Sequence, residues 1–196
     1  KTVEENKNAE YCWIIDPLDG TTNFMHKLPV YSISVALMHK NSLQIGIVYE
    51  INRNEIFNAI LNNGAYLNNN PIQISQNKDL SQSLIATGFP YYDFEKMDAY
   101  LNILRELMKS THGLRRMGSA AVDLAYTAAG RFEGFFEYSL APWDVAAGIL
   151  IAQEAGAKVY DFNGGSNYLF GKEIIACSPS IEKEFLTLIK NNFYPN

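Results

Sequence analysis

Two carboxylates close an apolar segment near the start of the chain. The segment reads Trp-Ile-Ile-Asp-Pro-Leu-Asp-Gly-Thr-Thr-Asn-Phe from Trp13 to Phe24, and its carboxylates belong to Asp16 and Asp19. The proline between them has a fixed φ and no N–H group, so we expect a strand to break here and the two side chains to converge. At ~5 Å and an effective dielectric of ~20, two such charges repel by about 3 kcal/mol. A bound cation would remove this repulsion.

The residues around Asp19 suit a metal ion and a phosphate group. Gly20 has no Cβ to obstruct a ligand, and Thr21 can begin a short helix whose free N–H groups would hold an anion. The Leu18 carbonyl stays free to coordinate, and hard oxygen ligands favour Mg²⁺. The alternative is that Asp-Pro and Asp-Gly are ordinary turn dipeptides at the end of a strand.

A second segment, Ala-Pro-Trp-Asp-Val-Ala-Ala-Gly from Ala141 to Gly148, predicts a helix that starts at or near Asp144. Alone, Asp144 is explained as a helix cap, because Asp is a preferred N-cap residue. Together, the two segments resemble the inositol monophosphatase family of magnesium-dependent, lithium-sensitive phosphomonoesterases. The family's signatures are an Asp-Pro-(Ile/Leu)-Asp-Gly-Thr loop and a Trp-Asp-x-Ala-(Ala/Gly)-Gly helix start, and this chain has both in that order.

The resemblance implies a role for each residue of these segments. Two or three Mg²⁺ ions would be held by Asp16, Asp19, Asp144 and the Leu18 carbonyl. Phosphate would be held by the amides of Gly20 and Thr21, with Asp19 and Thr21 as the catalytic residues and Thr21 orienting the attacking water. The reaction would be in-line attack by water on a phosphate monoester, without a protein nucleophile.

Two further segments imply a substrate side. Gly118-Ser119-Ala120-Ala121 is similar to the family's sugar-side helix start, which makes Ser119 and Ala120 substrate contacts, and Glu137 resembles its ligand for inositol hydroxyls. By local chemistry Ser119 is simply an N-cap, and alternation could place Glu133, Phe135 and Glu137 on a solvated face. A carboxylate that accepts two sugar hydroxyls would favour a polyol phosphate over a nucleotide.

Other activities stay open. A relative that cleaves fructose 1,6-bisphosphate or a 3′-phosphoadenosine nucleotide would share the metal loop. A binding or regulatory protein could keep the same fold, since some members of the family are partners of the transcription apparatus. The resemblance also implies a homodimer.

One feature of the family is not matched. A further metal carboxylate should come from a Glu-Glu segment whose expected position falls before Lys1, and Glu4 and Glu5 lie too near Asp16 to fit. The family's N-terminal helices are missing as well. We therefore interpret residues 1–196 as one phosphatase domain that lacks its N-terminal helical part.

Composition limits the partners. With 47% hydrophobic and 19% charged residues among 196, the chain can form one sizeable core. No apolar run approaches the ~20 residues that span a bilayer, which predicts no membrane segment. The net charge of −5 argues against nucleic acid. The exception is the basic stretch from Lys109 to Arg116, which is either a solvated face beside a strand or a contact for an anionic substrate or partner.

The cysteines and histidines are predicted to be structural. Cys12 and Cys177 lie in apolar, strand-like surroundings, which favours two buried free thiols and a reducing cytoplasm. His26, His39 and His112 have no metal-ligand spacing, which counts against a zinc hydrolase.

The periodicity predicts a layered mixed α+β fold, and the resemblance implies the αβαβα sandwich of the sugar-phosphatase type. Strands are expected as an antiparallel meander over 31–60, a hairpin over the Asn-rich 62–70 and a strand at 84–87. Helices are expected to start at Ser119 and Asp144, with a last one over 181–190. A further helix should bury the stripe Phe94, Met97, Leu101, Leu104 and Met108.

Overall fold

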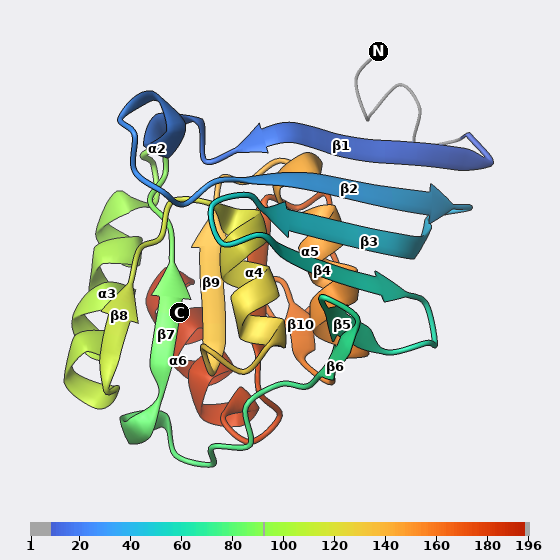
Figure 1. Ribbon diagram of the computed structural model, residues 1–196. Helices are drawn as coiled ribbons and strands as arrows, with labels where there is room; N and C mark the ends of the chain where they lie inside the picture. The colour runs from blue at the N-terminus through green and yellow to red at the C-terminus, as the bar shows by residue number, and fades with distance from the viewer. Residues whose placement is uncertain (1–8, 92, 195–196) are drawn as a thin grey trace.

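The computed structural model describes residues 9–91 and 93–194, which form two β-sheets with helices between and beside them (Figure 1). The first sheet is antiparallel throughout and has the strand order β1-β2-β3-β4-β5-β6. Its strands are β1 (Tyr11–Asp19), β2 (Ser32–His39), β3 (Ser42–Glu50), β4 (Glu55–Ile60), β5 (Ala65–Leu67) and β6 (Asn70–Ile72). The predicted meander is confirmed.

The Asn-rich stretch forms the predicted hairpin. Asn68 and Asn69, between β5 and β6, both have positive φ, which asparagine tolerates in tight turns. Asn62 and Gly64 have positive φ in the preceding turn. The carboxylate of Glu154 accepts the backbone N–H groups of Asn62 and Gly64 at 2.9 and 2.8 Å, so this turn is tied to a helix of the next layer.

The second sheet is mixed and has the order β10-β11-β9-β7-β8, with β7 parallel to both of its neighbours. Its strands are β7 (Leu84–Thr87), β8 (Gly113–Arg115), β9 (Gly134–Tyr138), β10 (Lys158–Tyr160) and β11 (Glu173–Cys177), and a 3₁₀ turn, η1 (Leu80–Gln82), precedes β7. The expected strand at 84–87 is confirmed as β7, which lies between β9 and the edge strand β8.

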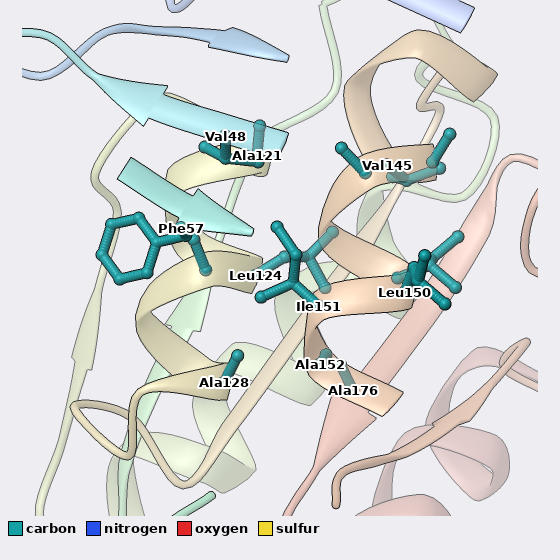
Figure 2. Packing of buried hydrophobic residues seen from close by; sticks show 14 of the residues in the cluster. Val48, Phe57, Ala121, Leu124, Ala128, Val145, Leu150, Ile151, Ala152 and Ala176 are labelled. Carbon is teal, nitrogen blue, oxygen red and sulfur yellow. The ribbon is translucent and has the colours of Figure 1, made fainter. Parts of the chain in front are cut away.

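Two apolar helices, α4 (Ala120–Ala128) and α5 (Pro142–Glu154), lie between the sheets. Every residue of α4 is buried, and Figure 2 shows Leu124 and Ile151 meeting between the two helices, with Phe57 of the first sheet packed against α4. A helix that is apolar on all sides has to be covered on all sides, which explains why both sit in the middle layer. Gly130 and Gly156 follow their ends with positive φ, as expected of helix stops.

Helices α3 (Met97–Ser110) and α6 (Glu182–Phe193) cover the other face of the second sheet and share a core cluster with it. The predicted buried stripe of α3 is wrong: Phe94, Leu101 and Met108 are 55%, 47% and 65% exposed. Of the predicted stripe only Leu104 belongs to the buried face, which consists of Tyr100, Ile103, Leu104 and Leu107.

The described residues thus supply the layers β, α, β and α of the expected sandwich. On the outer face of the first sheet, Tyr11, Trp13 and Ile15 of β1 are between 51% and 60% exposed. Glu4 and Glu5 lie outside the described residues. Among the described helices none is long and apolar enough to cross a membrane. Cys12 and Cys177 are both buried and free, as predicted.

Candidate active site

The predicted break in the first strand is present. β1 pairs with β2 up to Asp16, which faces Ser34, and its register shifts before Asp19 faces Ser32. The irregularity contains the proline, and the Leu18 N–H donates to Asp16 Oδ1 at 2.9 Å. Bulges of this kind re-aim side chains. Here the result is that both carboxylates turn toward one point at the end of the sheet.

The chain then turns sharply into the short helix α2 (Thr21–Met25). Gly20 precedes this helix with a φ of +87°, and a Cβ at this position would lie 3.0 Å from the Val30 carbonyl oxygen. Glycine is therefore required both by conformation and by space. The predicted helix start at Thr21 is confirmed, and Gly20, Thr21 and Leu18 all line the adjoining cavity.

Asp144 comes to the same point from the middle layer. The helix α5 begins at Pro142, so the predicted helix start at or near Asp144 is confirmed, with its first residue two positions earlier than Asp144. Asp144 reaches back from the first turn, and its Oδ2 accepts the N–H of Ala141 at 2.7 Å. The Ser34 hydroxyl donates to the Trp143 carbonyl at 3.2 Å, which fixes this helix start against β2.

The three aspartates converge. One carboxylate oxygen from each of Asp16, Asp19 and Asp144 can be chosen so that all three lie within 4.8 Å of one another. Burial raises the pKa of Asp19 to about 7 and that of Asp144 to about 6, and the neighbouring carboxylates add to both shifts. The pKa of Asp16 is raised by burial too. Three hard oxygen donors whose charges repel one another suit Mg²⁺, as predicted.

Asp19 also joins the first sheet to the middle layer. Its Oδ2 accepts the Ser119 hydroxyl at 2.5 Å and the Ala121 N–H at 2.9 Å. Ser119 is the N-cap of α4, as its local chemistry predicted, and its oxygen also accepts the Val122 N–H. Ser119 and Ala120 line the cavity, so the start of α4 forms part of the cavity wall.

Glu137 lines the same cavity. The prediction of a solvated face for Glu133, Phe135 and Glu137 is wrong, because all of β9 is buried and Glu137 is only 6% exposed. Both faces of the second sheet are covered, so alternating residues of β9 do not expose either face of the strand to solvent. Burial raises the pKa of Glu137 well above its usual range, and Asp19 and Asp144 add to the shift.

The cavity that contains these residues has a volume of about 540 Å³, enough for a small ligand. Sequence reasoning did not single out several of its lining residues, namely Gly88, Phe89, Pro90, Tyr91, Tyr138 and Trp143. The Gly88–Tyr91 loop carries no recognisable motif.

Asp123 was also missed: it is 1% exposed, and neither carboxylate oxygen has a hydrogen-bond partner among the described residues. The sequence feature that could have identified Asp123 is its position as the single acidic residue of a largely apolar helix.

Comparison with known proteins decides the family. The profile of the inositol monophosphatase family matches residues 1–192. The chain belongs to the inositol monophosphatase family. Within the family it is 43% identical to Nus factor SuhB of Escherichia coli K12 over 187 residues, which are 95% of this chain and 70% of that protein.

Solved structures of the family share the fold. The extragenic suppressor protein SuhB of Bartonella henselae superposes with a TM-score of 0.89 at 40% identity, covering 94% of this chain and 70% of the other. The inositol monophosphatase of Anabaena (Nostoc) sp. PCC 7120 gives a TM-score of 0.89 at 38% identity, with 93% and 74% covered. The family assignment and the layered fold expected from the sequence are confirmed.

Proposed function

We propose that residues 1–196 are a single domain of a magnesium-dependent phosphomonoesterase that hydrolyses a phosphate ester of inositol or of a similar polyol or sugar. The observation that carries the proposal is the convergence of three aspartates, from β1 and from α5, at one end of a cavity whose other side carries a buried glutamate. Family membership supports the reaction class.

The chain's residues divide the work as follows. Asp16, Asp19, Asp144 and the Leu18 carbonyl would hold the metal, with Asp19 kept in place by its hydrogen bond from Ser119. Mg²⁺ bound there would lower the pKa of a water molecule and neutralise the charge that develops on the phosphoryl group and the leaving oxygen.

The substrate is held by neighbouring groups. The amides of Gly20 and Thr21 bind phosphate oxygens, since N–H groups at a helix start have no partner within the helix. The Thr21 hydroxyl orients the attacking water. The Glu137 carboxyl, beside Ser119 and Ala120, receives the hydroxyls of the polyol.

The test is phosphate release from a panel of esters by the full-length protein. The panel contains inositol 1-phosphate, fructose 1,6-bisphosphate, a 3′-phosphoadenosine nucleotide and p-nitrophenyl phosphate, each with Mg²⁺ alone and with added Li⁺. We expect Mg²⁺-dependent, Li⁺-inhibited release that is faster from the polyol and sugar esters than from the nucleotide. Preferred cleavage of the nucleotide would overturn the substrate class and keep the reaction class.

A second candidate is a regulatory binding protein on the same fold, and the observation in its favour is the name Nus factor carried by relatives such as that of E. coli. Absence of phosphate release from every ester at saturating Mg²⁺ would establish this alternative over the first. The homodimer remains a proposal that sedimentation of the full-length protein would test. The cytoplasmic location is supported by the two free thiols.

A further inference from the structure

The cavity has an unequal charge distribution. Asp16, Asp19, Asp144 and Glu137 line it with four carboxyl groups, whereas Arg116 is the single basic side chain among the described residues that line it. The metal neutralises carboxylates at one end. The metal does not explain why the positively charged Arg116 lies in the same cavity.

Arg116 is held rigidly at the cavity wall. Its Nη2 group donates a hydrogen bond to the Tyr91 hydroxyl, and its guanidinium carbon lies 5.6 Å from the ring centroids of both Phe89 and Tyr91. Gly118 makes room for it, because a Cβ there would come within 2.6 Å of Nη1. A guanidinium that lies over aromatic rings and is hydrogen-bonded to one of them is a preorganised donor for a carboxylate or phosphate.

Its hydrogen-bonding capacity is not used up. The Arg116 Nε group is buried and has no hydrogen-bond partner among the described residues. No carboxylate of residues 9–91 or 93–194 forms an ion pair with Arg116. The positive charge of Arg116 opposes the rise in the pKa values of Glu137 and Asp123, but neither carboxylate forms an ion pair with it. An unpaired buried donor is costly, and an anionic ligand would relieve that cost.

Arg116 lies at the same end of the cavity as Glu137. A Cβ on Gly88 would overlap the Glu137 carboxylate, so that carboxylate packs directly on the Gly88 backbone. The next residue, Phe89, carries the ring over which Arg116 is held. Glu137 and Arg116 are therefore near each other in the cavity lining, on segments other than the strand β1 that carries Asp16 and Asp19.

We propose that Arg116 is a specificity-determining residue that binds a second anionic group, a phosphate or a carboxylate, on the leaving group of the substrate. The preferred substrate is then a sugar or polyol phosphate with a second negative charge remote from the ester that is cleaved. This inference rests on the proposed function for the placement of the reacting phosphate at the aspartates.

The test measures binding, so that it does not depend on turnover. Three non-hydrolysable analogues, in which a methylene replaces the ester oxygen, mimic glucose 1-phosphate, glucose 1,6-bisphosphate and glucuronic acid 1-phosphate. Their affinities for the full-length protein are measured by calorimetry with Mg²⁺ present. We expect at least one analogue with two anionic groups to bind about 10- to 100-fold more tightly than the glucose 1-phosphate analogue, which has one, as for a bidentate Arg–anion pair.

The variants separate recognition from general charge balance. R116Q should lose this preference and change the affinity of the singly anionic analogue less than about threefold. R115Q removes the same charge from the neighbouring exposed arginine, whose Nη1 donates to the Leu114 carbonyl, and should keep the preference. R116K keeps the charge without the planar guanidinium and should retain part of the preference for a second anionic group. If R116Q does not fold, R116K provides the test.

Each result has one meaning. A response of the phosphate analogue alone, or of the carboxylate analogue alone, assigns the chemistry of the second group. Absence of any preference in the wild-type protein, or equal weakening of all three analogues by R116Q and R116K, overturns the inference and leaves Arg116 as a counter-charge for Glu137 and Asp123. If the preference is present while no ester releases phosphate, the inference stands and the catalytic proposal fails.

Discussion

The two ends of the cavity differ in how their polar groups are held. At the metal end, Asp16, Asp19 and Asp144 each accept a hydrogen bond from a backbone N–H, which fixes one oxygen of every carboxylate. At the substrate end, the buried Nε group of Arg116 has no hydrogen-bond partner among the described residues. The metal end is thus set by the fold, while the substrate end retains a donor that a ligand has to satisfy.

The largest effect is expected from Asp19→Asn. Loss of this ligand should reduce turnover by about 10³-fold or more, since metal-ion catalysis is worth several kcal/mol. It should also abolish stabilisation by Mg²⁺, because a bound ion stabilises the folded state by mass action. Phosphate release and thermal melting with and without Mg²⁺ measure both losses.

Asp98→Asn is a control for Asp19→Asn, because Asp98 is an exposed acidic residue in the first turn of α3. It should leave both properties unchanged. Near-normal turnover by the Asp19 variant would show that the metal assignment is wrong.

Glu137→Gln should act on the substrate end alone. A hydrogen bond to a charged group is worth about 1.5–3 kcal/mol, so hydrolysis of inositol phosphate should fall about 10- to 100-fold. Hydrolysis of p-nitrophenyl phosphate should not change, because its leaving group has no hydroxyl for Glu137 to bind. Equal losses on the two esters would contradict a role in substrate recognition.

Ser119→Ala should have a smaller effect, and on the metal end. It removes the hydroxyl that donates to Asp19, and loss of such an outer hydrogen bond commonly weakens metal binding about tenfold or more. The concentration of Mg²⁺ that gives half-maximal activity should therefore rise. Ser119→Thr keeps the hydroxyl and should return this concentration to its normal value. An unchanged Mg²⁺ requirement in Ser119→Ala would contradict the role of this hydrogen bond.

The smallest effect is the dependence of stability on pH without Mg²⁺. In the unfolded chain these carboxyls titrate near pH 4, whereas burial raises the pKa to about 7 for Asp19 and to about 6 for Asp144. Between pH 4 and 7 the folded state binds more protons, so the free energy of unfolding falls as the pH rises.

Differential scanning at pH 5 and pH 8 tests this dependence. The melting temperature should be lower at pH 8, and Mg²⁺ should reduce the difference because the cation replaces the protons. A melting temperature that rises with pH in the absence of Mg²⁺ would contradict the assignment of buried, mutually repelling carboxyls.

The metal end could be predicted from the sequence because its geometry is local. Pro17 and Gly20 dictate the backbone around Asp16 and Asp19, and the residues after Pro142 dictate a helix start. Alternation likewise predicted β2, β3 and β4, since each has one face on the core.

The substrate end could not be predicted in the same way. Arg116 was visible only as part of a basic stretch, because its function depends on Phe89 and Tyr91, which a different loop supplies. The solvated face assigned to β9 was wrong because α4 covers one face of that strand and α6 the other. The stripe on α3 was wrong because exposed apolar residues mimic a periodic face.

The hydrogen bonds of Asp19 to Ser119 and Ala121 have a consequence for how activity is lost. They make one ligand oxygen depend on the docking of a helix start against a strand end, so a slight parting of these layers would spoil ion affinity while leaving the backbone of each layer intact. Heating or a destabilising substitution should therefore abolish activity before circular dichroism detects any loss of secondary structure.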